Sequence, residues 1–152
     1  MIKKIIIRPA ADRDIEEIYN IELKSFDKPF TLENLKHEFS VRFSDFFVVE
    51  IENKVTAYAI VWKVHDEIHL NKIAVSEEYR KTGIGREVVD YIIRNVNPGY
   101  AKVILIEVRE RDTGTRSFYK KLKFTETGFR KDYYIDDNAV LMERKIIKPS
   151  QK

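Results

Sequence analysis

Residues 68–89, IHLNKIAVSEEYRKTGIGREVV, decide how the rest of this sequence is organised. The stretch reads as an extended apolar segment, a polar turn, a basic loop with glycines at 83 and 85, and the start of an amphipathic helix. Glycine lacks a Cβ, so such a loop can bend tightly and bring its backbone N–H groups close to an anion. The first turn of the helix offers unpaired amides and the positive end of its dipole to the same anion. The stretch therefore predicts a strand, a phosphate-binding loop and a helix.

Arg80, Lys81 and Arg86 add positive charge around this loop. The glycine spacing taken alone is a weak signal, because with glycine at about 7% of residues it arises by chance on the order of once in ten chains of this size. An ordinary strand-to-helix turn would look the same. The other segments must therefore decide between the two interpretations.

The composition indicates one globular domain at 1–147 followed by a short frayed tail at 148–152. Hydrophobic residues make up 43% of the 152 residues, yet no apolar run approaches the roughly 20 residues that a membrane span needs. The N-terminal apolar run is too short for a signal peptide, so we expect a cytoplasmic protein. The absence of cysteine excludes a cysteine-ligated metal site and a thiol nucleophile. A net charge of +3 suits an anionic ligand but is too small to indicate nucleic acid.

The first half of the sequence predicts a strand, two helices and an antiparallel meander. Residues 4–8 are rich in β-branched side chains, and Asp12 or Asp14 can cap the helix that follows. That helix ends near residues 25–26, and a second helix begins after Thr31 as its N-cap. The meander has three strands joined by short polar turns, at 46–52, 55–64 and 68–75.

The second half predicts a strand–helix–strand crossover and a terminal hairpin. A helix from Gly85 stops at residues 97–99, and the strand at 102–109 carries four consecutive apolar residues, which is typical of a strand buried on both faces. The crossover makes this strand parallel to the one at 68–75. A helix and two strands complete the chain, at 115–122, 124–131 and 139–147. The sequence thus predicts an α/β fold with a mixed sheet, whose strands part where the meander meets the crossover.

Glu107 stands out because it interrupts an apolar run and is followed by Val108. Ligands of open α/β sheets bind at the carboxyl ends of strands, so Glu107 and the glycine loop should be neighbours. Burial disfavours the charged form of a carboxylate and so suits it to take up a proton. The structural alternative is a strand-end carboxylate paired with Arg109 or a lysine. Tyr119 on the next helix could offer its hydroxyl to the same space, although a core aromatic residue would show the same pattern.

Five short motifs, taken together, resemble the GNAT superfamily of acetyl-CoA-dependent N-acetyltransferases, and most closely its RimI-like branch, which acetylates protein N-termini. Each motif is modest, whereas their order and spacing over most of the chain are specific. The motifs are Ile73-Ala74-Val75, Arg80-Lys81-Thr82-Gly83-Ile84-Gly85-Arg86, Ile106-Glu107-Val108-Arg109, Phe118-Tyr119-Lys120-Lys121-Leu122-Lys123-Phe124 and Arg130-Lys131-Asp132-Tyr133-Tyr134.

The resemblance implies a GNAT fold, a mostly antiparallel mixed sheet with a parallel pair splayed at the acetyl-CoA site and helices on both faces. The backbone of residues 73–75 would bind the pantetheine arm and the acetyl carbonyl, and residues 81–86 would hold the pyrophosphate. Glu107 falls on the position of the general base, and Tyr119 on that of the general acid. The residues that fall where RimI-like enzymes grip the acceptor are Phe30, Tyr133 and Tyr134. No metal is implied.

Three residues depart from the family pattern. Asp112 stands where the family usually has an asparagine that contacts the cofactor, and a carboxylate is less welcoming to the anionic coenzyme. Lys123 replaces the usual glycine of an L-G-F sequence, and Phe30 replaces a more frequent tryptophan.

The expected acceptor is a protein or peptide N-terminus, including that of a ribosomal protein. A protein α-amine has a pKa of about 8 and lysine one of about 10.4, so the α-amine costs roughly 3 kcal/mol less to deprotonate. Lysine side chains remain open as acceptors, as do small amines such as polyamines or antibiotics, for which Asp136 and Asp137 could supply an acidic pocket. A module that only senses acyl-CoA is the non-catalytic alternative. We expect no nucleic-acid or membrane partner, and a monomer or homodimer.

Overall fold

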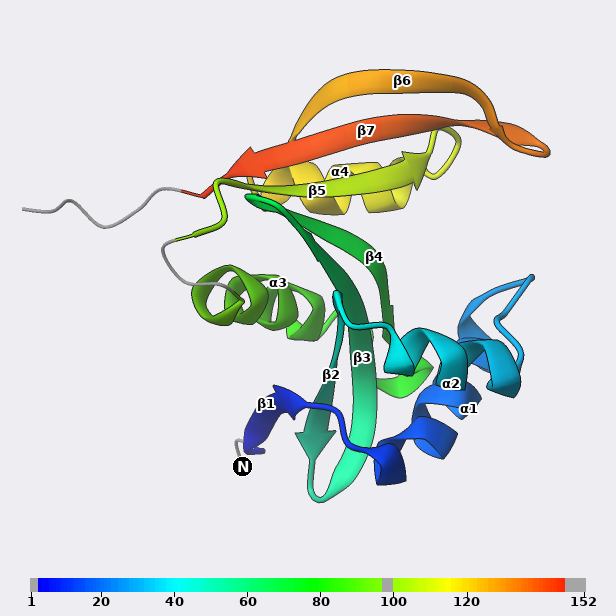
Figure 1. The fold of residues 1–152 in the computed structure, drawn as a ribbon, viewed down its shortest axis with the longest axis vertical. Coiled ribbons are helices and arrows are strands. Elements are labelled where there is room, and N and C mark those ends of the chain that lie inside the picture. Colours follow the sequence, from blue (N-terminus) through cyan, green and yellow to red (C-terminus); the bar gives the residue numbers. More distant parts are fainter. Residues whose placement is uncertain (1–2, 97–99, 147–152) are drawn as a thin grey trace, which may run out of the picture.

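The computed structural model describes residues 3–96 and 100–146, which form a seven-stranded mixed sheet with helices on both faces (Figure 1). The strand order is β1-β2-β3-β4-β5-β7-β6. The strands are β1 Ile5–Pro9, β2 Ser44–Ile51, β3 Lys54–Val64, β4 Glu67–Val75, β5 Val103–Arg109, β6 Thr125–Tyr134 and β7 Asp137–Lys145. The helices are α1 Ile15–Ser25, α2 Leu32–Ser40, α3 Ile84–Asn95 and α4 Thr113–Lys121, with short 3-10 helices η1 Asp12–Asp14 and η2 Glu77–Tyr79. The predicted α/β architecture is confirmed.

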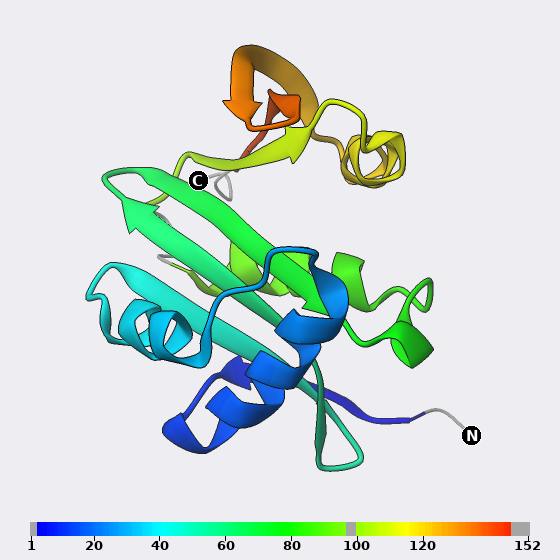
Figure 2. The ribbon, with the colours of Figure 1, turned by 90° about the vertical axis from the view of Figure 1, so that its right-hand side faces the viewer.

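Two apolar cores lie on opposite faces of the sheet. Helices α1 and α2 cover one face of β2–β4 and bury Ile18, Leu35 and Tyr58 against it (Figure 2). Helices α3 and α4 pack on the other face, where the core includes Val89 and Ile104. Each large aliphatic side chain buried in these cores contributes roughly 1.5–3 kcal/mol. The amphipathic pattern of each helix thus fixes which face of the sheet it covers.

The parallel pair β4 and β5 is short. The two strands pair over three residues, from Glu67 with Val103 to His69 with Leu105. Beyond His69 they part, so the edge of residues 70–75 that faces β5 has no strand partner within the described ranges. Figure 1 shows the same separation, with β5, β6, β7 and α4 turned away from β2–β4. The predicted parallel crossover and the predicted parting of the strands are both confirmed.

Two local predictions are wrong. The strand β5 is not buried on both faces, because Ile104, Ile106 and Val108 are buried while the alternate residues are half-buried or exposed. Asp14 occupies the N-cap position of α1 but makes no capping hydrogen bond with its side chain. By contrast, the predicted cap of α2 is confirmed, because the Thr31 side chain accepts a hydrogen bond from the Asn34 amide.

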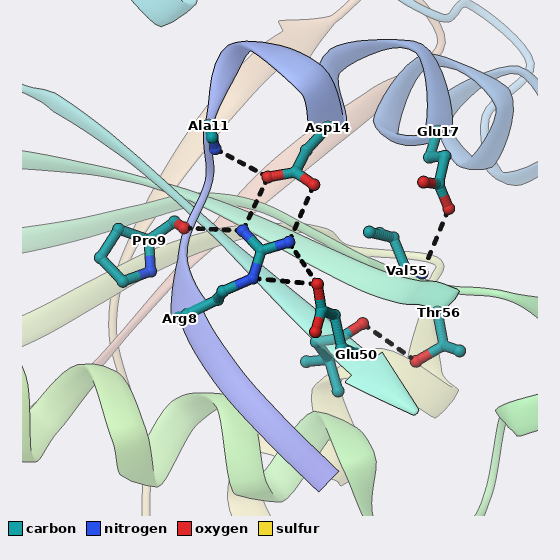
Figure 3. Close-up of polar contacts among 9 residues, drawn as sticks. Arg8, Pro9, Ala11, Asp14, Glu17, Glu50, Val55 and Thr56 are labelled. Atoms are coloured by element: carbon teal, nitrogen blue, oxygen red, sulfur yellow. Dashed lines mark hydrogen bonds and ion pairs between the residues drawn. The ribbon is translucent and has the colours of Figure 1, made fainter. Parts of the chain in front are cut away.

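The carboxylate of Asp14 binds Arg8 instead, in a network that joins β1, η1 and β2 (Figure 3). The Arg8 guanidinium donates to both carboxylate oxygens of Asp14, at 2.7 and 2.9 Å, and to Oε1 of Glu50, at 2.5 Å. The Ala11 amide donates to Asp14 as well, at 2.7 Å. The hydrogen bonds between Asp14 and Arg8 hold the pKa of the Asp14 carboxyl below its usual value. The network therefore fixes where α1 leaves the first strand.

Several predicted boundaries fall outside the described residues, namely the helix stop at 97–99, the last residue of the final strand, Ile147, and the tail at 148–152. Helix α3 itself ends at Asn95. None of the helices in the described ranges is both long and apolar enough to cross a membrane.

Candidate active site

The glycine loop leads from β4 through η2 into α3, as the sequence predicted. Gly83 is the N-cap of α3 and has a φ of 90°, a left-handed conformation that costs other residues roughly 1–2 kcal/mol. A Cβ added to Gly83 would meet no atom of the described part of the chain within 4 Å, so the backbone here borders open space. The side chains of Lys81 and Arg86 beside it are exposed. An anion can therefore reach the unpaired amides at the start of α3.

Arg80, which the sequence grouped with the cations of this loop, instead folds back along β4. Its Nε donates to the carbonyl oxygen of Val75 at 2.8 Å, and its Nη2 lies 3.4 Å from Oγ of Ser25 on α1. The Thr82 hydroxyl donates to the carbonyl oxygen of Tyr79 at 2.5 Å. These two side chains thus shape the turn, and Lys81 and Arg86 are the loop's remaining cations.

The segment Ile73-Ala74-Val75 ends β4, where β5 has already parted from it. Ala74 is buried in the core under α1 and α2, whereas Ile73 and Val75 pack against the core on the opposite face. The side chains therefore anchor the segment, while its backbone edge towards β5 has no strand partner among the residues that the structure describes. An extended ligand can add to such an edge through backbone hydrogen bonds.

Glu107 projects from the face of β5 opposite to Ile106 and Val108. Its side chain is 34% exposed, so the predicted burial of this carboxylate is wrong. The physical reason is the alternation of side chains along the strand, together with the loss of β4 as a neighbour beyond Leu105. A carboxylate in this position keeps contact with water and can accept a proton directly or through one water molecule.

Two tyrosines of β6 surround Glu107. The rings of Tyr133 and Tyr134 meet edge to face with centroids 5.1 Å apart. The pKa of Tyr133 is raised chiefly by its hydrogen bond to the Glu107 carboxylate, and the pKa of Tyr134 is raised by burial and then by the charge of Glu107. Nη1 of Arg130 lies 3.7 Å from Oε1 of Glu107. Each tyrosine carries a guanidinium over its ring, that of Arg130 on Tyr133 and that of Arg109 on Tyr134.

Asp136 and Asp137 do not form an open acidic pocket. Asp136 pairs with Nη1 of Arg109 at 2.5 Å, and this hydrogen bond lowers the pKa of Asp136. Asp137 accepts the backbone amides of Arg111 and Asn138, at 2.9 and 2.8 Å, and the first of these contacts does most to lower its pKa. A cationic small amine would have to displace these partners.

Tyr119 lies in the core on α4, between the rings of Phe118 and Phe124. The residue is 4% exposed, and burial raises its pKa, so the hydroxyl stays protonated at neutral pH. This hydroxyl makes no hydrogen bond with any residue that the structure describes. A Cβ on Gly85 would lie 3.0 Å from Cζ of Phe118. The glycine at 85 therefore lets α4, with Tyr119, pack closely against the start of α3.

The three residues that depart from the family pattern each have a defined place. Phe30 is partly buried and packs against the core beneath α1 and α2. Asp112 is the N-cap of α4 and accepts the amide and the hydroxyl of Thr115, at 3.0 and 2.7 Å. A carboxylate caps a helix about as well as an asparagine does, which accounts for its tolerance here. Lys123 follows α4 with a φ of 69°, the conformation that favours glycine.

The sequence analysis missed two charged residues beside Phe30. Glu22 of α1 is fully buried, and Nζ of Lys72 lies 2.6 Å from its Oε2. The same ammonium lies 3.9 Å from the ring centroid of Phe30. The only signal in the sequence was an acidic residue at a helical position otherwise taken by apolar ones.

The sheet opens at one parallel pair, with a glycine-capped helix on one side of the opening and the carboxylate of Glu107 on the other. Residues 15–124 match the model of the acetyltransferase (GNAT) family. The chain therefore belongs to the GNAT family of acetyltransferases. Its parallel pair, glycine loop and α3 all lie within the matched residues.

Two relatives that are 30% identical to the chain are both named as N-acetyltransferases. The chain is 30% identical to the [ribosomal protein bS18]-alanine N-acetyltransferase of Haemophilus influenzae, over 85% of this chain and 90% of that protein. It is also 30% identical to the N-alpha-acetyltransferase of Sulfurisphaera tokodaii, over 92% of each.

Solved structures agree with the fold. The ribosomal-protein-S18-alanine N-acetyltransferase of Escherichia coli superimposes with a TM-score of 0.87 at 24% identity, covering 97% of both chains. A GNAT family acetyltransferase from Elizabethkingia anophelis, solved with acetyl-CoA bound, superimposes with a TM-score of 0.77 at 17% identity, over 93% of this chain and 97% of that one.

Proposed function

We propose that this protein transfers the acetyl group of acetyl-CoA directly to the N-terminal α-amine of another protein. The observation that carries the proposal is the gathering of Glu107, Tyr133 and Tyr134 where β5 parts from β4. Glu107 is the general base and Tyr119 the general acid. The names of the two relatives, one for the alanine of ribosomal protein bS18 and one for α-amines, support this class of acceptor.

The residues present fit acetyl-CoA. The space beside Gly83 would take the pyrophosphate against the amides of α3, and the free edge of residues 73–75 would take the pantetheine arm. When bound, the cofactor supplies an activated thioester with a thiolate leaving group. The proposed contacts are Ile73, Ala74, Val75, Lys81, Thr82, Gly83, Ile84, Gly85, Arg86 and Asp112.

The two groups proposed to transfer protons lie in opposite environments, Glu107 in contact with solvent and Tyr119 buried. Glu107 keeps contact with solvent, so its carboxylate can take the proton of the acceptor amine and pass it on to water. Tyr119 is buried and holds its proton on the phenol oxygen at neutral pH, which suits it to protonate the departing sulfur. Direct transfer suits a chain without cysteine, because no acyl-thiol intermediate on the protein is available.

The acceptor side favours a peptide over a small cation. Aromatic rings are available from Phe30, Tyr133 and Tyr134, while Asp136 is already paired with Arg109. An α-amine also needs less help than lysine from a solvent-exposed base, by roughly 3 kcal/mol. A ribosomal protein as acceptor would have the enzyme act in the cytoplasm, where such proteins are made.

The decisive experiment uses mass spectrometry of a peptide that begins with alanine, as the acceptor of the bS18-specific relative does, and carries one internal lysine. The peptide is incubated with acetyl-CoA and the wild type, Glu107→Gln, or the control Glu143→Gln on β7. We expect acetyl on the α-amine, at a rate about 100-fold lower in Glu107→Gln and unchanged in the control.

Binding of acetyl-CoA is measured in parallel by calorimetry. Acetyl on the lysine alone would replace the α-amine by a side-chain acceptor. Binding of acetyl-CoA without transfer to any of a varied set of peptides would contradict the proposal and favour small amines or a sensing module.

A further inference from the structure

Glu22 carries a carboxylate buried between α1 and the sheet, at 0% exposure. Three donors surround it. The Phe30 amide donates to Oε2 at 2.9 Å, the ammonium of Lys72 lies 2.6 Å from the same oxygen, and the Tyr58 hydroxyl donates to Oε1. The carboxylate therefore joins α1, β3 and β4 to the segment 26–31 that links α1 and α2.

The ammonium of Lys72 is equally well placed. Its side chain is 17% exposed, and Nζ lies 4.3 Å from the ring centroid of Phe26 and 3.9 Å from that of Phe30. A cation over two aromatic rings is attracted by both, and more strongly where water is excluded. The ion pair and the two rings thus form one contact set, which we call the Glu22–Lys72 clamp (Glu22, Lys72, Phe26, Phe30 and Tyr58).

Stability alone does not account for this clamp. Removing two charges from water costs nearly as much as their attraction returns, and apolar residues of similar volume often stabilise a protein as well or better. Neighbouring positions in this core, such as Ile18 and Ile60, are filled with apolar side chains. A buried ion pair in such a place is better explained by what it holds in position than by its energy.

The clamp joins the two sides of the proposed site. Its loop end holds the backbone and ring of Phe30, a proposed acceptor contact. Its strand end is Lys72, which directly precedes the segment 73–75 proposed to bind the acetyl-bearing arm. Helix structure stops at Ser25 and resumes at Leu32, so segment 26–31 is neither helix nor strand, and Phe30 in it is held by its contacts with Glu22 and Lys72.

We propose that Glu22 and Lys72 are positioning residues that hold Phe30, and with it the acceptor's N-terminus, at a fixed distance from the donor segment of β4. This inference rests on the proposed function, because it takes Phe30 as part of the acceptor site. Loss of the clamp does not alter the glycine loop or α3. The affinity for the acceptor therefore falls, and the affinity for acetyl-CoA does not change.

The test compares Lys72→Met, Glu22→Gln, the double variant Glu22→Gln/Lys72→Met and Lys72→Arg. Lys72→Met leaves a buried carboxylate without its cation and is the variant most prone to misfold. The double variant removes both charges and avoids that problem. Lys72→Arg retains the positive charge and its attraction to the rings. Lys102→Met, which removes a lysine 70% exposed and paired with Asp66, is the matched control.

Steady-state kinetics with the alanine peptide should show an acceptor KM raised at least tenfold in the double variant. The KM and dissociation constant for acetyl-CoA should stay within twofold, and Lys72→Arg should recover most of the acceptor affinity. An acceptor KM within twofold of the wild type in a folded double variant would overturn the proposal. A parallel loss of acceptor binding, acetyl-CoA binding and melting temperature would reduce the clamp to a purely structural role and would also overturn it.

Hydrogen exchange separates a failure of this inference from a failure of the proposed function. The Phe30 amide donates to Glu22, so its exchange should accelerate at least tenfold in the double variant and not in Lys102→Met. If the wild type acetylates no peptide, the proposed function fails, and the exchange rate still decides whether the clamp fixes Phe30. Unchanged exchange at Phe30 would refute the clamp whatever the activity.

Discussion

Nη1 of Arg130 lies 3.7 Å from Oε1 of Glu107, although β7 runs between the two strands that carry them. The same carboxylate raises the pKa of Tyr133, so one anion acts on both a cation and a phenol. The protonation of the phenol therefore reports on the surroundings of the proposed base.

Two substitutions should move the pKa of Tyr133 in opposite directions. Glu107 raises this pKa, because hydrogen bonding to its carboxylate favours the protonated phenol and its charge repels the phenolate, whereas Arg130 lowers it. Glu107→Gln should therefore lower the pKa of Tyr133 and Arg130→Gln should raise it. NMR titration of tyrosines labelled at Cζ measures both, with Tyr100, distant in sequence, as the internal reference. Shifts of the same sign would contradict the arrangement.

Tyr119→Phe should abolish most of the activity and leave the fold intact. The hydroxyl makes no hydrogen bond within the described residues and the ring is packed on both sides, so melting temperature should change by little. As the proposed acid, the hydroxyl should contribute about 100-fold to kcat. Because burial raises its pKa, the loss should be the same at pH 6 and pH 9. A kcat within twofold of the wild type would remove Tyr119 from the mechanism.

Replacing either glycine of the glycine loop should weaken acetyl-CoA binding, but for different physical reasons. In Gly85→Ala the new Cβ would lie 3.0 Å from Cζ of Phe118, so α3 and α4 must separate slightly, at about 1 kcal/mol or more. In Gly83→Ala the Cβ has free space but φ is 90°, which costs roughly 1–2 kcal/mol. Phe118→Leu should restore acetyl-CoA binding, measured by calorimetry, in Gly85→Ala and not in Gly83→Ala. Rescue of both, or of neither, would show that packing at Phe118 is not the cause.

Lys123→Gly should stabilise the protein by about 0.5–1 kcal/mol, because the residue has a φ of 69°. The hydrogen bond from the Phe124 amide to the carbonyl oxygen of Tyr119, at 3.0 Å, closes the end of α4 in the form that glycine favours. Urea unfolding measures the gain. Lys123→Ala, which removes the side chain and keeps the strained conformation, should give none of it, and equal gains would assign the effect to charge.

Asp14 should make stability depend on acid pH. Its pKa is held below the unfolded value of about 3.9 by Arg8, so its contribution is present above that value and is lost as pH falls through the lower, folded pKa. Asp14→Asn should cost about 1–3 kcal/mol at pH 7 and progressively less below pH 4. Asp12→Asn, at an exposed neighbour, should stay within about 0.5 kcal/mol. A constant difference between wild type and Asp14→Asn from pH 7 to pH 2 would contradict the role of the ion pair.

The sequence predicted the elements and their order because their signals are local. The cap at Thr31, the turn glycines and the crossover into β5 each depend on neighbouring residues. It failed where the decisive partner is distant. Glu22 is buried because Tyr58 and Lys72, 36 and 50 residues away, supply its hydrogen bonds.

Glu107 shows a second limit. An apolar run predicted burial on both faces, yet exposure of β5 depends on how far β4 stays beside it, and that is a property of the whole sheet. The roles of the site residues came from family resemblance and remain predictions. The structure adds that Glu107 meets Tyr133 and Tyr134, while Asp136 is paired elsewhere.

The short ladder between β4 and β5 divides the sheet of this enzyme into two parts that are under different evolutionary constraints. The part with β4 and the glycine loop is the proposed acetyl-CoA site, and its ligand stays the same whatever the acceptor. The part with β5, β6 and β7 pairs with it through three residue pairs in the sheet, so the proposed acceptor contacts Tyr133 and Tyr134 can change more freely than Phe30, which Glu22 and Lys72 tie to the β4 side. Substitutions that change the acceptor can therefore accumulate on β6 without altering the part of the sheet that holds the acetyl donor.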